Sequence, residues 1–243
     1  MHAIDVPTQQ TVEFVQACVA QGSHILEVGC GDGEVAFALS RRGFQVTAID
    51  SDPERIAKAQ KPGIRAMVAA WPEFEIAPVD AIVFTRSLHH MDRLIEAIDR
   101  AQSVLKPNGT LLVDDFAVES ATEPTLNWFR NLVQVAPFAA VAQPHPDSFV
   151  TKLLLSESPM KTFEDHHTAH QVHPFDLMHR LITERFARCT VQPVPYFYRY
   201  FASVAGETGK GADLVKKFLH REIEAAEGDE IVLIGRRIVG RMI

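Results

Sequence analysis

A glycine-rich segment near the N-terminus has the residue types and spacing of a ligand-binding loop. The segment Ile25-Leu-Glu-Val-Gly-Cys-Gly-Asp-Gly33 places glycines at positions 29, 31 and 33, directly after an apolar run. Glycine lets the backbone turn sharply and leaves room for a ligand against it. Asp50 follows about 20 residues later, where the acidic residue of a dinucleotide-binding fold contacts ribose. The pattern predicts a cofactor site.

The charge around this loop bears on which cofactor it holds. Gly31-Asp-Gly-Glu-Val-Ala36 satisfies G-x-G-x-x-A, so an NAD-dependent oxidoreductase is one interpretation. Glu27, Asp32 and Glu34 would surround the loop, and carboxylates there would repel a pyrophosphate at the helix N-terminus. A cationic cofactor suits the loop better.

Two adjacent histidines end the fourth apolar run of the chain. His89 and His90 follow Asp80–Thr85, and open α/β sheets bind ligands at the carboxyl ends of their strands. Imidazoles at that place are candidate acid–base catalysts. The alternative is that they cap the next helix or pack below the pocket.

A second group of histidines lies farther along the chain, at positions 166, 167, 170 and 173. Spacings of three and four residues can place two imidazoles on one helix face, which allows a metal site. Pro174 argues against a continuous helix, and no third ligand is identifiable, so we expect no metal. A polar pocket wall or a solvated loop is the favoured interpretation, and contact of His166 or His170 with a substrate is the alternative.

Alternating strands and helices would position these residues. A helix capped by Thr8 comes first, and the turn Lys106–Gly109 precedes the last of five expected strands. These strands are His24–Val28, Phe44–Asp50, Ile64–Val68, Asp80–Thr85 and Thr110–Val113. The rhythm indicates an α/β fold with a mainly parallel sheet and helices on both faces.

The regular alternation of expected strands and helices ends after about residue 118. We interpret 119–174, which mixes prolines with apolar runs around Trp128 and Phe129, as an inserted lid. Phe175 begins another expected helix, and 213–226 resembles a charged surface helix. Tyr196–Phe201 and Ile231–Ile234 are expected as the last two strands. The chain is thus read as one domain over 1–243, with a core at 1–118 and the remaining sheet within 175–243.

Composition limits the function classes. The 243 residues carry 24 basic and 31 acidic side chains, for a net charge of −7, and no basic run suited to nucleic acid. Three scattered cysteines give no disulfide framework, so a cytoplasmic location is expected. Neither an export signal nor a membrane span is expected. The oligomeric state is not readable.

With these residues in place, the chain resembles the class I S-adenosylmethionine-dependent methyltransferases. The resemblance rests on E-V-G-C-G-x-G, Asp50, the S-L-H-H ending and the turn before strand five, and it covers roughly Val12 to Phe116. It implies a Rossmann-like seven-stranded sheet ending in an antiparallel hairpin, here built from Tyr196–Phe201 and Ile231–Ile234. It also implies methyl transfer to a small-molecule acceptor, with S-adenosylhomocysteine as product. The alternative from another class is a member that only binds the cofactor.

The resemblance also implies which residues contact the cofactor. Cys30 matches a small residue of the family loop, although a thiol beside a helix N-terminus can also be a nucleophile. Many relatives have an Asp after strand three, but Ala69-Ala-Trp71-Pro has none, so Trp71 is expected to stack on adenine instead. The implied contacts are Glu27, Gly29, Cys30, Gly31, Gly33, Asp50, Ser51, Ala70, Trp71, Thr85 and Arg86.

Overall fold

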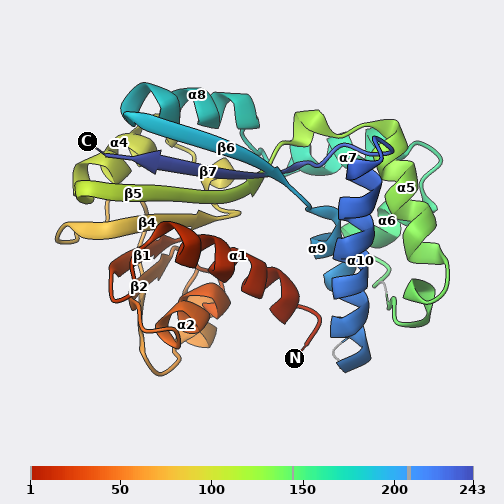
Figure 1. The fold of residues 1–243 in the computed structure, drawn as a ribbon, viewed down its shortest axis with the longest axis horizontal. Coiled ribbons are helices and arrows are strands. Elements are labelled where there is room, and N and C mark those ends of the chain that lie inside the picture. The colour runs from red at the N-terminus through yellow and green to blue at the C-terminus, as the bar shows by residue number, and fades with distance from the viewer. Residues whose placement is uncertain (1, 144, 207–208, 243) are drawn as a thin grey trace. The chain divides into compact units, whose positions relative to one another are not determined.

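The computed structural model describes residues 2–143, 145–206 and 209–242. Its strands form one seven-stranded sheet in the order β3-β2-β1-β4-β5-β7-β6 (Figure 1). Strands β1 to β5 pair in parallel, which confirms the predicted α/β class. The strands are β1 (His24–Val28), β2 (Gln45–Asp50), β3 (Ile64–Val68), β4 (Val79–Thr85), β5 (Leu105–Phe116), β6 (Arg188–Val194) and β7 (Gly235–Arg241).

Helices connect and surround these strands. In the N-terminal half they are α1 (Asp5–Cys18), α2 (Glu34–Ser40), α3 (Pro53–Ala59), the 3₁₀ turn η1 (Leu88–His90) and α4 (Leu94–Val104). Later in the chain they are η2 (Val118–Ser120), α5 (Glu123–Gln134), η3 (Phe138–Ala140), α6 (Phe149–Leu155), α7 (Pro159–Ala169), α8 (Phe175–Arg185), α9 (Phe197–Ala202) and α10 (Gly209–Glu227). Across the described ranges, no helix combines the length and apolar character needed to cross a membrane.

Local chemistry explains several boundaries. The Asp52 side chain accepts from the backbone N–H of Glu54 at 2.8 Å and of Arg55 at 3.3 Å, and Pro53 occupies the first turn of α3. Helix α1 begins at Asp5, so the expected cap at Thr8 is wrong. The turn predicted at 106–109 is an irregularity inside β5, where Asn108 adopts a φ of 62°.

The C-terminal strand predictions are also wrong. Residues 197–202 form helix α9, and the last strand begins at Gly235, after the apolar run Ile231–Ile234. The antiparallel pair of the sheet is instead β6 and β7. Gly235 is required where it lies, because a Cβ there would come within 2.5 Å of the Val194 carbonyl oxygen. The expected antiparallel ending is therefore present, but it is built from other residues.

The chain separates into two compact units. One contains 1–7, 117–172 and 193–235, and the other contains 8–116, 173–192 and 236–243. The second unit holds β1 to β5 and a core in which α1, α2 and α3 pack on these strands. In the first unit, α9 and α10 lie side by side (Figure 1). Residues 193–235 thus group with 117–172, although the last two strands of the sheet were expected within them, at Tyr196–Phe201 and Ile231–Ile234.

Candidate active site

The glycine loop connects β1 to α2, and two of its glycines are required by close packing. All three glycines have positive φ, at 72°, 54° and 76° for Gly29, Gly31 and Gly33. A Cβ on Gly29 would lie 2.5 Å from the Ser87 Cβ, and one on Gly33 would lie 2.8 Å from the Ala59 Cβ. A Cβ on Gly31 would meet only an Arg55 side-chain nitrogen at 4.0 Å. The middle glycine therefore leaves open space for a ligand.

Asp50 ends β2 with its carboxylate held by the backbone. Oδ2 accepts from the Gly31 N–H at 2.8 Å, and Oδ1 accepts from the Asp52 N–H at 3.0 Å. The loop is fixed to the same strand, because Gly29 and Cys30 both donate to the Ile49 carbonyl oxygen. A carboxylate has roughly four acceptor positions, so the two occupied ones leave capacity for two hydroxyl donors.

A cavity of about 570 Å³ lies at the carboxyl ends of β1, β2, β3 and β4, within the size range of small-ligand sites. In the sheet, β2 and β3 lie on one side of β1, whereas β4 and β5 lie on its other side. The strand order therefore reverses next to β1, and the cavity lies at this switch point of the sheet. The cavity is lined by Val28, Gly29, Gly31, Ile49, Asp50, Ser51, Arg55, Ala69, Ala70, Trp71, Glu73, Arg86, Ser87, His90, Met91, Asp92 and Arg93.

Most of the expected cofactor residues therefore meet at one place. Four expected cofactor residues are not part of the cavity lining: Glu27, Cys30, Gly33 and Thr85. Of the two adjacent histidines, His90 lines the cavity and His89 does not. Burial raises the pKa of the Cys30 thiol, and the nearby carboxylates of Glu27 and Asp50 raise it further. This protonated thiol favours the interpretation of Cys30 as a small packing residue.

Glu27 lies in the middle of β1 and is 1% exposed. Its Oε2 has no hydrogen-bond partner within the described part of the chain. Burial raises the pKa of Glu27 to about 8, against the opposing effects of the Ala36 N–H and the Arg86 charge. A positive ligand group near this carboxyl would favour its ionised form, because an opposite charge lowers the pKa of an acid.

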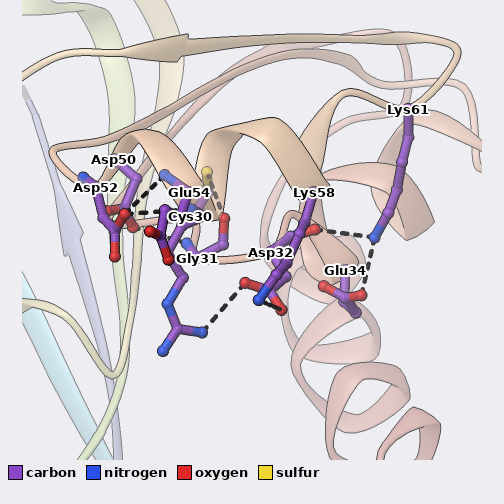
Figure 2. A network of polar contacts seen from close by, with 10 residues as sticks. Cys30, Gly31, Asp32, Glu34, Asp50, Asp52, Glu54, Lys58 and Lys61 are labelled. Carbon is purple, nitrogen blue, oxygen red and sulfur yellow. Dashed lines mark hydrogen bonds and ion pairs between the residues drawn. The ribbon is translucent and has the colours of Figure 1, made fainter.

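The other acids of the loop are already paired (Figure 2). Asp32 contacts Arg55 at 3.2 Å and Lys58 at 3.9 Å, while Glu34 contacts Lys61 at 2.8 Å. These exposed pairs contribute little stability. The three cations offset the negative charge of Asp32 and Glu34. These two carboxylates therefore repel a pyrophosphate at the loop less than the sequence alone suggests.

Trp71 is held in place at the edge of the cavity. Its Nε1–H donates to the Ala97 carbonyl oxygen of α4 at 3.0 Å, and its ring meets Phe84 edge-on with centroids 6.4 Å apart. Stacking on adenine stays a prediction for this fixed indole. Two carboxylates missed by the sequence analysis, Glu73 and Asp92, also line the cavity, and Glu73 is paired with Arg93.

The adjacent histidines occupy different environments. His90 is exposed and lines the cavity, whereas His89 is 4% exposed. The His89 Nδ1 lies 2.5 Å from Oδ1 of the buried Asp115, and the His89 ring meets Phe116 edge-on. If Nδ1 donates to the carboxylate, Nε2 of a neutral His89 is a proton acceptor. Asp115 was not among the residues expected from the sequence.

The later histidines divide between the two units. His166 stacks on Phe149 with ring centroids 4.1 Å apart and lies 4.6 Å from the His170 ring. Burial is the main cause that lowers the pKa of His166 to about 4, followed by the charges of His167 and His170. His173 belongs to the other unit, where its Nε2 lies 3.0 Å from the Met91 carbonyl oxygen. Within 2–143, 145–206 and 209–242, no three His, Cys, Asp or Glu side chains are grouped to hold a metal.

Comparisons with known proteins agree with this geometry. Residues 8–154, more than half of the chain, match the family model described as a methyltransferase domain. An uncharacterized methyltransferase of Mycobacterium tuberculosis is 33% identical over 128 residues, covering 48% of this chain and 64% of the relative. A ubiquinone biosynthesis O-methyltransferase of Xylella fastidiosa is 35% identical over 101 residues, covering 38% and 41%. The chain thus spans less than two thirds of the length of these relatives.

Solved structures share the fold over nearly the whole chain. A protein of Anabaena variabilis, described as a methyltransferase from an antibiotic biosynthesis pathway, is 18% identical with a TM-score of 0.61 over 96% of both chains. The phosphoethanolamine N-methyltransferase 2 of Haemonchus contortus, in complex with S-adenosyl-L-methionine, is 15% identical with a TM-score of 0.58 over 96% of this chain and 52% of that chain. The family match and the shared fold lead to one conclusion: this chain belongs to the methyltransferase-domain family, the class I S-adenosylmethionine-dependent methyltransferases.

Proposed function

We propose that the chain transfers a methyl group from S-adenosylmethionine to a small-molecule acceptor. The observation that carries the proposal is the cavity at the switch point of the sheet, where Asp50 and the open backbone at Gly31 meet. The named O-methyltransferase relative supports an acceptor of small size and an oxygen nucleophile.

The residues present fit this cofactor. Asp50 has acceptor capacity for the two ribose hydroxyls, and Trp71 offers an aromatic face for adenine beside Ser51 and Ala70. The buried Glu27 Oε2, which has no partner in the described ranges, suits a positive group on the loop side. When bound, the cofactor supplies a methyl group on a sulfonium, which is already activated for attack. The chain therefore has to align the acceptor and exclude water.

His89 and His90 are the proposed groups for moving the acceptor proton. In this proposal His89 donates its Nδ1–H to the Asp115 carboxylate, 2.5 Å away, and its Nε2 accepts a proton from a hydroxyl or an amine. His90 is proposed to line the acceptor end of the cavity. Contact of His166 or His170 with the acceptor, and closure of 119–174 as a lid, stay predictions.

The test is S-adenosylhomocysteine release from S-adenosylmethionine in the presence of alcohols, phenols and amines. An acceptor-dependent release is the expected result. Asp115→Asn should then lower kcat by about 10- to 100-fold with little change in KM for S-adenosylmethionine, because the imidazole loses its orientation. Saturable cofactor binding without turnover on any acceptor would instead favour a member that only binds the cofactor.

A further inference from the structure

The short turn η1, which carries the two adjacent histidines, is anchored where it begins. It follows Ser87, whose Oγ–H donates to the Val28 carbonyl oxygen of β1 at 2.6 Å. Two hydrogen bonds close the turn itself, from the His90 N–H to the Ser87 carbonyl oxygen at 3.2 Å and from the Met91 N–H to the Leu88 carbonyl oxygen at 3.1 Å. Because a 3₁₀ turn of three residues has few bonds of its own, its last carbonyl groups need donors from elsewhere.

His173 supplies these donors from the segment that precedes α8. Its backbone N–H donates to the His89 carbonyl oxygen at 2.9 Å, and its ring Nε2 lies 3.0 Å from the Met91 carbonyl oxygen. A carbonyl oxygen only accepts hydrogen bonds, so Nε2 carries the proton in this contact. That proton is present in the neutral Nε2–H tautomer and in the imidazolium alike, so the contact does not depend on the charge of His173.

The carbonyl groups that His173 holds belong to residues at the cavity or directly beside it. His90 and Met91 line the cavity, and the His89 ring lies 4.1 Å from the His90 ring between centroids. The His89 Nδ1 is also 2.5 Å from Oδ1 of the buried Asp115. A bond this short tolerates little displacement, so a shift of the turn would disturb both the bond and the place of the two imidazoles.

We propose that His173 is a positioning residue for methyl transfer, because its ring donor fixes the turn that presents His89 and His90 to the acceptor. The catalytic part of this inference rests on the proposed function. His173 is also the residue at which the chain returns to this unit after 117–172. The competing role is therefore a purely structural one, in which the ring only fastens the returning chain.

Hydrogen exchange of the His89 Nδ1–H, followed by NMR, separates the two roles. A proton in a short bond to a buried carboxylate resonates far downfield, and His89→Gln identifies the signal by removing it. His173→Phe keeps an aromatic ring but removes the donor, so the turn should open more often and exchange should become about tenfold faster. His173→Gln, whose amide can donate from nearly the same position, should stay within about threefold of wild type.

A control variant and a turnover measurement complete the test. His179 is another half-buried histidine, and its ring stacks on Phe175 with centroids 5.7 Å apart. His179→Phe should leave the exchange rate of the His89 proton at the wild-type value. With an alcohol, phenol or amine that wild type methylates, His173→Phe should lower kcat by about 10- to 100-fold, and His173→Gln should restore most of that loss.

Each contrary result has a distinct meaning. A wild-type exchange rate in His173→Phe, accompanied by a lower Tm, would mean that the ring only fastens the chain, and it would overturn the inference. Equal acceleration in His173→Phe and His173→Gln would overturn it too, because the donor would then not matter. An unchanged kcat in His173→Phe would overturn the catalytic part. If wild type releases no S-adenosylhomocysteine with any acceptor, the proposed function fails, while the exchange rates still decide whether His173 holds the turn.

Discussion

Two glutamates in different compact units are almost completely buried, and they have opposite surroundings. Glu222 of α10 is 0% exposed and accepts three backbone N–H groups at the start of α9, from Tyr196 at 2.6 Å and from Phe197 and Tyr198 at 2.9 Å. Glu27 of β1 is 1% exposed, yet its Oε2 has no partner in the described ranges. Three N–H donors compensate the burial of the Glu222 carboxyl, whereas the Glu27 Oε2, which is buried outside the cavity lining, has no such donor in the described ranges.

The largest effect should come from Glu222→Ala. Three buried N–H groups would lose their acceptor, and each unsatisfied group costs about 1–3 kcal/mol, so the free energy of unfolding should fall by about 3 kcal/mol or more. Chemical denaturation measures this loss. Affinity for S-adenosylhomocysteine should be unchanged wherever the variant is folded, and a selective loss of that affinity would break the comparison.

Two glycine variants in the loop that follows Glu27 distinguish a glycine required by packing from one that faces open space. Gly29→Ala should lower the free energy of unfolding by about 2–4 kcal/mol, because the new Cβ meets Ser87 and the backbone is left-handed. Gly31→Ala meets open space, so only the backbone cost of about 1–2 kcal/mol is expected. Thermal and denaturant unfolding of both variants measure the difference, and equal losses would contradict the packing argument.

The sequence predicted β1 to β4 and the glycine loop closely because short apolar runs, glycines and prolines are local signals. The C-terminal region failed for a long-range reason. The alternating aromatic residues of 196–201 read as a strand, but Glu222 stabilises the helix start from about 25 residues away. Asp115 could have been found from the sequence, because it follows the fifth expected strand just as His89 follows the fourth. The two strand ends are neighbours in the structure, where Thr85 of β4 pairs with Asp114 of β5. The ion pair between Asp32 and Arg55 could not be predicted from the sequence, because it depends on where α3 places Arg55.

Glu27→Gln should have a smaller effect on binding, with a pH dependence that identifies it. Because burial raises the pKa of Glu27 to about 8, the free carboxyl is protonated at neutral pH and must release its proton to pair with a cationic ligand. Wild-type affinity for S-adenosylmethionine should therefore rise with pH toward about 8, and Glu27→Gln should remove this component and weaken binding by about tenfold. Calorimetry in buffers of different ionisation enthalpy measures the proton released.

A further expected effect is a slope of stability with pH to which both glutamates contribute. The raised pKa values, about 8 for Glu27 and about 7 for Glu222, mean that the folded chain keeps two protons that the unfolded chain loses near pH 4.5. Stability from these groups is full below that pH and is lost as the pH rises through about 7 and 8. Without ligand, each Glu→Gln variant should flatten its part of the slope. A stability that increases from pH 5 to 8 through these groups would contradict the assigned directions.

The central claim is that Asp50 and the glycine loop hold S-adenosylmethionine, and parallel calorimetric titrations test it most directly. S-adenosylmethionine, S-adenosylhomocysteine and NAD are titrated into the wild-type chain and into Asp50→Ala, with folding of the variant checked by denaturation. We expect saturable binding of the two sulfur compounds, no binding of NAD, and a loss of about 100-fold in Asp50→Ala. Binding of NAD alone, or an Asp50→Ala affinity equal to that of wild type, would contradict the claim.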